Sequence, residues 1–578
     1  MHLYLSVHKG KLMKKNRFIK TNTRAVVAVA LLITSPISIS ANYDLLDQRQ
    51  NIFGNIEQNT PLTNESLSSP SILDSMQQEK INEKKRDYLN VLKLLKQNKL
   101  EEAGHKLTLL LKQYPENPEL YNLLALSEIM NKDTASAEKS YQKTISIDNN
   151  NILAHLGLSK LALDTGDLVK AKEYANKVLG INNKIVNAHL LLADIAYKQK
   201  NINEVEFVLS SAHEKVKGDI SAEIQVIQSL GQFYVFQKQP EKILLLSEDL
   251  VKRYPDDSKA LSLLAGAQIV NNLKSLAETT LTQIINKEKQ DINHRLLLAK
   301  LLAEYENKEK EVIELLDYAL ETAPSNPEVY VFKTDYLIKL KRYPEASELA
   351  DLAEKKFPSM SVGNLLKGDV MFAEHKWDNA IDNYQKAYLK QPANKILFII
   401  VDIMNAQKKS PDAIKLLDNE LAKNSKNSAI HFKLATTYQQ QNDYKQAENH
   451  YNAVLIVQPD NVLALNNLAW IYALENKPQA LELAKKAYTL APESAAIADT
   501  YGHLLVKHNQ QAEGLKLLEK AAKLAPKLED IQFHLAEAYA ANDQQAKAIE
   551  ILERITTAEQ NFSEKKPAVD LLDKLKKK

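Results

Sequence analysis

The 578-residue chain contains no cysteine, which excludes disulfide bonds, thiol nucleophiles, cysteine-ligated zinc and iron–sulfur clusters. The lipid-attachment cysteine of a bacterial lipoprotein is missing for the same reason. Glycine is scarce, with 13 residues, so glycine-rich phosphate-binding loops are scarcely possible. No P-loop, G-x-G-x-x-G, G-x-S-x-G or H-E-x-x-H motif occurs. We therefore expect a protein that is not an enzyme and that holds no cofactor and no metal.

Proline is also uncommon, with 18 residues, and long alternating runs of β-branched residues are absent. Leucine, alanine, lysine, glutamate, glutamine and asparagine are abundant instead, and these residues favour helices. The composition therefore predicts an all-α fold. Because the chain is longer than one hydrophobic core usually serves, it must hold several domains or a core built from repeats.

Positive charge is concentrated at the N-terminus, although the formal net charge of the whole chain is only +2. Residues 1–41 carry seven lysines and arginines and no acid, so the remainder has 68 basic and 73 acidic residues, a net charge of −5. A mildly acidic chain with evenly mixed charges is a poor candidate for nucleic-acid binding, and we expect none.

The same N-terminal segment has the layout of a secretory signal peptide. A basic stretch at 14–24 precedes the apolar stretch AVVAVALLI at 25–33, and the sequence turns polar at Asn42. We predict a signal peptide at 1–41, cleaved after Ser40 or Ala41, and export to the periplasm. The alternative is an uncleaved anchor that tethers the chain to the inner membrane, although the 17 residues of 25–41 fall short of the about 20 needed to span a bilayer. No later segment is apolar enough to cross a membrane.

Residues 42–83 are rich in asparagine, serine, glutamine and proline and predict a disordered linker. Beyond them, small residues and prolines recur at a fixed period. Alanines are spaced by 33 or 34 residues, and prolines follow some of them by twelve. The alanines are Ala103, Ala137, Ala171, Ala346, Ala380, Ala413, Ala447 and Ala480, and the prolines are Pro115, Pro358, Pro392, Pro459 and Pro492.

This period resembles the tetratricopeptide repeat, a unit of two helices. The segment FKLATTYQQQNDYKQAENHYNAVLIVQPDN at 432–461 nearly reproduces the family pattern, with Leu434, Ala435, Tyr438, Ala447, Tyr451 and Pro459 in the expected positions. The resemblance implies an all-α, right-handed α-α superhelical solenoid of about fourteen helix pairs, each stabilised by its neighbours. We divide it into arrays of about four repeats at 84–219 and about ten repeats at 220–561. A capping helix with a basic tail follows at 562–578, with Val569, Leu571, Leu572 and Leu575 on its apolar face.

In this family, ligands usually bind a concave face lined by the first helices, at the fifth, ninth and twelfth positions of the repeat. The resemblance therefore implies groove contacts at Asp194, Tyr197, Asp335, Asp369, Phe372, Phe432, Thr436, Gln439, Asn466, Trp470, Asp499, His503, Phe533 and Glu537. Acids, amides and aromatics suit a peptide, a partner helix or a glycan. Acids at several positions argue against the family's clamp for C-terminal carboxylates.

Three histidines, His155, His189 and His431, share the fourth position of their repeats, where other repeats place Tyr121, Leu261 or Tyr330. We interpret them as packed rings and not as a metal-binding set.

The segment 464–506, which contains Trp470, resembles the closing repeats of tetratricopeptide proteins in bacterial exopolysaccharide and exosortase/PEP-CTERM systems. This resemblance implies an exported scaffold or adaptor that mediates protein–protein interactions in envelope assembly or polysaccharide export. The alternative is a periplasmic glycan-binding module in which Trp470, Phe432 and Phe372 stack on sugars, so a polysaccharide is a second kind of partner.

Overall fold

The computed structural model describes residues 86–557, 562 and 564–577. Helices joined by short turns make up this part of the chain, and no strand occurs in it. The predicted all-α fold of repeated helix pairs is therefore confirmed. The predicted signal peptide and linker lie outside the described residues.

The helices form two compact units that divide between Thr322 and Ala323. The first unit begins with a helix at 86–96 and continues with α5 (Leu100–Gln113), α6 (Pro118–Met130), α7 (Thr134–Ile147), α8 (Ile152–Thr165), α9 (Leu168–Ile181), α10 (Val186–Lys198), α11 (Ile202–Val216), α12 (Ile220–Phe236), α13 (Pro240–Arg253), α14 (Ser258–Val270), α15 (Lys274–Lys287), α16 (Ile292–Leu302) and α17 (Glu309–Thr322).

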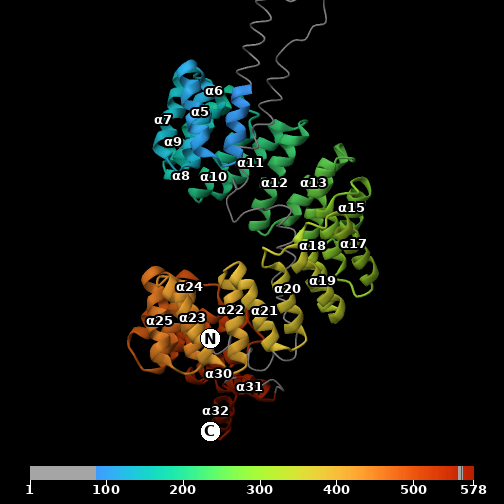
Figure 1. Cartoon of the computed structure of the whole chain (residues 1–578). Coiled ribbons are helices and arrows are strands. Elements are labelled where there is room, and N and C mark those ends of the chain that lie inside the picture. Colours follow the sequence, from blue (N-terminus) through green and yellow to red (C-terminus); the bar gives the residue numbers. More distant parts are fainter. Residues whose placement is uncertain (1–85, 558–561, 563, 578) are drawn as a thin grey trace, which may run out of the picture. The chain divides into compact units, whose positions relative to one another are not determined.

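The second unit contains α18 (Pro327–Lys339), α19 (Tyr343–Lys356), α20 (Val362–Ala373), α21 (Trp377–Lys390), α22 (Asn394–Ala406), α23 (Ser410–Lys423), α24 (Ser428–Gln440), α25 (Tyr444–Val457), α26 (Val462–Leu474), α27 (Gln479–Leu490), α28 (Ala495–Lys507), α29 (Gln511–Leu524), α30 (Glu529–Ala541), α31 (Gln545–Thr557) and α32 (Lys565–Lys576). Within each unit, helices that follow one another in the sequence pack side by side (Figure 1).

The helix ends are specified by local sequence. Asn or Asp often stands at the N-cap, as at Asn151, whose side chain accepts a hydrogen bond from the Ala154 N–H. In most repeats, one residue between the two helices takes a left-handed backbone conformation. Glycine holds this position at Gly166, with φ of 86°, whereas Lys341 and Asn442 hold it with φ of 60° and 61°.

Small residues are required where the two helices of a repeat cross. Within one repeat, a Cβ atom on Gly368 of α20 would lie 2.6 Å from the ring of Tyr384 on α21. A small residue is also needed between repeats, because a Cβ atom on Gly157 of α8 would lie 2.4 Å from the ring of Tyr141 on α7, the second helix of the preceding repeat. Ala435 of α24 holds the position equivalent to Gly368 and is fully buried, and so is Ala447 on the paired helix α25. In the repeat of α20 and α21, the small residue of the first helix is thus matched to a large ring of the second helix.

First helices of consecutive repeats also contact one another. In the first unit α8 contacts α10, α10 contacts α12, and α12 contacts α14. In the second unit the same holds for α18 with α20, α22 with α24, α26 with α28, and α28 with α30. The second helices contact mainly the helices that precede and follow them, so the first helices crowd together on the inner side of each stack.

Two irregular regions are accommodated without breaking the stack. The extra residues near 216–223 lengthen α11 and α12 to 15 and 17 residues, with a turn at Gly218 where φ is 99°. At the other end α32 packs on α31 with Ala568 and Leu575 buried. Val569 is 39 % exposed, so its predicted place on the apolar face is wrong. The packed face runs through Ala568 and Leu575, which are buried, and Leu571 and Leu572, which are partly buried, and Val569 lies beside it.

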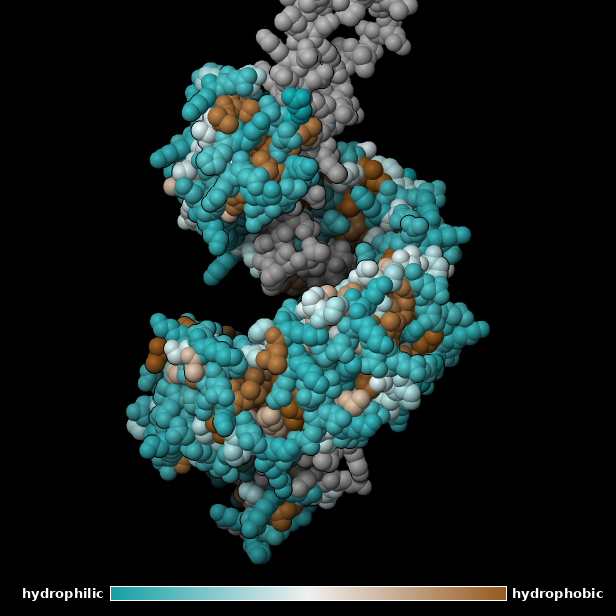
Figure 2. Space-filling model, in the orientation of Figure 1, coloured by the Kyte–Doolittle hydropathy of each residue, from teal (hydrophilic) through white to brown (hydrophobic). Residues whose placement is uncertain are grey.

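The visible surface of both units is mostly hydrophilic, with hydrophobic side chains in small separate patches (Figure 2). No helix in the described part of the chain combines the length and apolarity that a bilayer span requires.

Candidate functional site

The predicted groove residues all lie on first helices, which form the inner side of each unit. Asp194 and Tyr197 are on α10 of the first unit. The others are distributed over the second unit, with Asp335 on α18, Asp369 and Phe372 on α20, Phe432, Thr436 and Gln439 on α24, Asn466 and Trp470 on α26, Asp499 and His503 on α28, and Phe533 and Glu537 on α30.

Five of these side chains are almost completely buried between neighbouring helices, namely Asp194, Gln439, Asn466, Asp499 and Phe533. Gln439 accepts a hydrogen bond of 2.7 Å from the hydroxyl of Tyr451, and Phe533 packs in the core that α30 shares with α31 and α32. Because these five side chains are buried, they support the inner helices and do not form the accessible surface. Half-buried neighbours on the same helices offer the accessible atoms.

An acidic pair lies at the start of the second unit. Asp335 and Asp369 occupy equivalent positions on α18 and α20, two first helices that contact each other. Burial raises the pKa of Asp335 to about 7, and the charge of Asp369 adds to this shift. Burial also raises the pKa of Asp369 to about 6, against the opposing effects of a 2.6 Å hydrogen bond from the Tyr384 hydroxyl and of the Lys395 ammonium. Sequence analysis missed Tyr384 and Lys395, because neither occupies a groove position.

Aromatic side chains of the inner helices rest on rings of the second helices. Phe372 meets Trp377 at 5.1 Å between ring centroids, Phe432 meets Tyr451 at 5.7 Å, and Trp470 meets Tyr444 at 5.7 Å, all edge to face. The hydroxyl of Thr436 donates to the carbonyl of Lys433 within its own helix. The three groove aromatics are therefore held in fixed orientations while remaining partly exposed.

A cluster of two histidines and two carboxylates lies at the end of the second unit. Nδ1 of His534 lies 2.9 and 3.0 Å from the two carboxylate oxygens of Asp499, and the His503 and His534 rings are 4.2 Å apart between centroids. Nδ1 of His503 lies 3.4 Å from Oε2 of Glu537. Burial lowers the pKa of His503 well below its usual value, and His534 and Lys507 lower it further.

The pKa values of His534 and Glu537 shift upward. Burial alone would lower the pKa of His534, but the charge and hydrogen bond of Asp499 outweigh it and raise the pKa. Burial raises the pKa of Glu537. Sequence analysis missed His534. The signal that could have found it is its spacing of three residues from Glu537, which puts both side chains on one face of α30.

The three histidines of the fourth repeat position lie in separate repeats. Nε2 of His155, His189 and His431 lies 2.8, 2.9 and 3.0 Å from a backbone carbonyl oxygen six residues earlier. Tyr330 makes the same contact through its hydroxyl, at 3.1 Å from the carbonyl of Pro324. Each of these rings ties its own helix to the preceding loop, so the three histidines do not come together as a ligand set.

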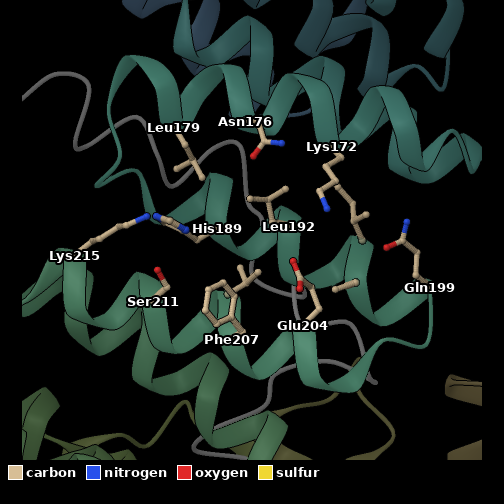
Figure 3. Close-up of a pocket in the computed structure, with 13 residues that line it drawn as sticks. Lys172, Asn176, Leu179, His189, Leu192, Gln199, Glu204, Phe207, Ser211 and Lys215 are labelled. Atoms are coloured by element: carbon tan, nitrogen blue, oxygen red, sulfur yellow. The ribbon is translucent and has the colours of Figure 1, made fainter.

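A pocket of about 180 Å³ opens between α9 and α11, and residues of α10 also line it. Lys172 and Leu179 come from one side and Phe207 and Lys215 from the other (Figure 3). Phe207 is 68 % exposed. The volume is below the roughly 300–1,000 Å³ of small-molecule sites, so it suits one side chain of a partner better than a metabolite. Sequence analysis did not predict this pocket, because it depends on how two second helices splay apart.

Three parts of the chain match models of the tetratricopeptide repeat, at residues 88–152 and 432–495 for one model and 530–561 for another. The chain thus contains tetratricopeptide repeats, as the sequence predicted.

Similarity to known proteins covers the chain unevenly. An uncharacterized protein, ycf37 of Porphyra purpurea, is 33 % identical over 98 residues, which is 17 % of this chain and 53 % of that protein. This chain therefore spans about half the length of that relative. Among solved structures, yeast Tom70 is 17 % identical with a TM-score of 0.31, and the match covers 81 % of this chain and 96 % of the Tom70 chain. A tetratricopeptide repeat protein from Parabacteroides merdae is 20 % identical with a TM-score of 0.32, and the match covers 38 % of this chain and 88 % of that protein's chain.

Proposed function

We propose that this protein is an exported scaffold that binds segments of partner proteins along its inner helices and serves envelope assembly or polysaccharide export. A role for tetratricopeptide repeats in protein–protein interaction supports the scaffold. The observation that carries the binding mode is the pair of half-buried carboxylates Asp335 and Asp369 on adjacent inner helices.

The chemistry of this pair favours a basic partner segment. Each carboxyl group resists ionisation because it is partly removed from water, and Asp335 is further affected by the charge of Asp369. A guanidinium or ammonium group placed between them would favour ionisation of both, and a planar guanidinium can bind carboxylates through two parallel hydrogen bonds. The same surface repels the C-terminal carboxylate of a peptide.

An apolar neighbour adds a second recognition element. Phe372 follows Asp369 by three residues on α20, so the two side chains share one face of the helix. The edge contact with Trp377 holds the Phe372 ring in place. We therefore expect a partner segment in which an arginine or lysine lies close to an apolar side chain.

Binding of capped synthetic peptides, measured by fluorescence polarisation, tests this proposal. Peptides with arginine beside leucine should bind, whereas peptides with glutamate in place of arginine should not. The double variant Asp335→Asn, Asp369→Asn should weaken binding at least tenfold. Asp382→Asn is the matched control, because Asp382 lies on the second helix α21, is 60 % exposed and pairs with Lys386. Equal binding of acidic and basic peptides, or a double variant that binds like the control, contradicts the proposal.

Export is tested separately. Cells that express the chain from Met1 should contain a periplasmic form whose N-terminal residue, read by mass spectrometry, is Ala41 or Asn42. A cytosolic protein that retains residues 14–41 would remove the export part of the proposal and leave the scaffold untouched. Co-purification of components of a polysaccharide-export machine from membrane extracts tests the assigned process.

The three fixed aromatics of the groove favour a glycan as the second candidate ligand, since sugar faces stack on exposed rings. The chain has two tryptophans, Trp377 and Trp470. In a Trp377→Phe variant the remaining fluorescence reports on Trp470 alone, and a polysaccharide that binds there should quench it. An unchanged signal with neutral and acidic polysaccharides rejects this candidate.

A further inference from the structure

Two adjacent inner helices of the second unit bring two histidines and two carboxylates together. α28 supplies Asp499 and His503, four residues apart, and α30 supplies His534 and Glu537, three residues apart. Both spacings put the members of a pair on one helix face. In the part of the chain that the structure describes, one ligand atom each from His503, His534 and Glu537 lies within 4.8 Å of the others.

Asp499 fixes how one of these rings is presented. Nδ1 of His534 donates to the carboxylate of Asp499, which is 3 % exposed and held between the helices. Nε2 is the nitrogen of His534 that remains for another ligand. A carboxylate behind a histidine fixes the tautomer and the ring orientation, and this arrangement is typical of metal-bound histidines.

The geometry of the remaining atoms fits a small cation. Oε2 of Glu537 is buried and makes no hydrogen bond within the described residues. It lies 3.4 Å from Nδ1 of His503. Tetrahedral zinc, with bonds of about 2.1 Å, needs ligand atoms roughly 3.4 Å apart. The side chains of His503 and Glu537 are 19 % and 34 % exposed, so the cluster lies near the surface although Oε2 of Glu537 itself is buried.

We propose that His503, His534 and Glu537 bind one divalent transition-metal ion of the Zn²⁺ class, with Asp499 as the positioning residue. Three protein ligands leave the fourth position of a tetrahedral ion open. Because the site lies on inner helices, this position can take a histidine or carboxylate of a bound partner segment. Lys507, one turn after His503, opposes the ion, whereas Asp499 and Glu564 contribute charge in its favour. The metal site does not depend on the acidic pair at the other end of the unit.

The test uses the full chain without a polyhistidine tag, stripped with EDTA and titrated with Co²⁺ and Zn²⁺. We expect one equivalent of Co²⁺ to give the strong visible absorption of tetrahedral coordination, and Zn²⁺ to abolish it. His503→Ala and Glu537→Gln should each weaken Zn²⁺ binding at least tenfold. Asp499→Asn should weaken it by about 10–100-fold, because the ring of His534 loses its fixed orientation.

His450→Gln is the matched control, since His450 and His431 form a histidine pair at 2.9 Å between Nδ1 atoms that lies outside the proposed ligand set. Its Zn²⁺ affinity should equal that of the unchanged chain. Circular dichroism in EDTA checks folding, and Glu537→Gln, whose side chain is partly exposed, covers the case in which a histidine variant unfolds. Zn²⁺ should raise the melting temperature of the unchanged chain and not that of Glu537→Gln. Absence of the Co²⁺ band, or equal Zn²⁺ affinity in the ligand variants and the control, overturns the proposal.

Discussion

Substitution of glycine by alanine should have opposite effects on the stability of this protein at two helical positions. Gly363 lies in the first turn of α20, where a Cβ atom would come within 2.3 Å of the Glu354 Cα on α19. The obstacle is backbone, so no side-chain rotation can relieve it. Gly104 lies inside α5, and a Cβ atom there would meet nothing within 4 Å.

The magnitudes follow from these surroundings. Alanine in place of an unhindered helical glycine reduces the conformational entropy of the unfolded chain, and Gly104→Ala should stabilise by about 0.5–1 kcal/mol. At Gly363 the two helices must separate to admit the methyl group. Overpacking of this kind costs about 1–3 kcal/mol, which exceeds the propensity gain.

Thermal unfolding followed by circular dichroism at 222 nm measures both changes. At about 2–4 °C per kcal/mol, Gly363→Ala should melt several degrees lower than the unchanged chain, and Gly104→Ala one or more degrees higher. Hydrogen exchange should increase in α19 and α20 of Gly363→Ala and remain unchanged elsewhere. If both variants melt alike, or if exchange rises uniformly, the close approach of α19 and α20 is not what this structure describes.

Three further predictions concern the turns and the buried charges. Lys341→Gly should increase the free energy of unfolding by up to about 1 kcal/mol and so raise the melting temperature, because the left-handed conformation strains lysine. Gly166→Ala should lower the free energy of unfolding by about 1 kcal/mol, because alanine is strained at the φ of 86° that Gly166 adopts. The raised pKa of Asp335, about 7 against 3.8 for a free side chain, means that folding takes up a proton between these pH values. Stability therefore falls as pH rises through 7. The urea concentration at the unfolding midpoint should be higher for Asp335→Asn than for the unchanged chain at pH 8, but not at pH 3. Glu223 is fully buried, and its carboxylate accepts two hydrogen bonds from Arg253, at 2.8 and 2.5 Å. Burial raises the pKa of Glu223, but Arg253, the N–H of Gly218 and His213 together outweigh it and lower the pKa below 4.5. Glu223→Gln should therefore cost about 1.5–3 kcal/mol near pH 7, and the difference should vanish in acid.

The repeats could be predicted from sequence because their determinants are local. Helix propensity, N-cap residues such as Asn151 and the 33- to 34-residue spacing of Ala413, Ala447 and Ala480 act within one repeat or between neighbours. The same reasoning placed every candidate groove residue on a first helix. It misplaced Val569, because the short terminal helix allows two nearby apolar faces and its packing on α31 selects one.

The function of individual groove residues could not be read in the same way. Gln439 and Trp470 were both predicted as groove contacts, yet Gln439 is buried against Tyr451 whereas Trp470 is partly exposed beside Tyr444. Burial at these positions depends on the size of side chains in the next helix. A pattern of positions carries no information on that fit.

By itself the amino-acid sequence determined that this protein is built from helix pairs with small residues at their crossings, since those features arise from contacts that recur every repeat. Tertiary structure alone decided which side chains of different repeats meet: Asp335 with Asp369, and His534 with Asp499 and His503. The reason is geometric. Contacts between repeats depend on the rotation of each helix against the next, and a change of a few ångströms separates a cluster of ligands from a row of unrelated side chains.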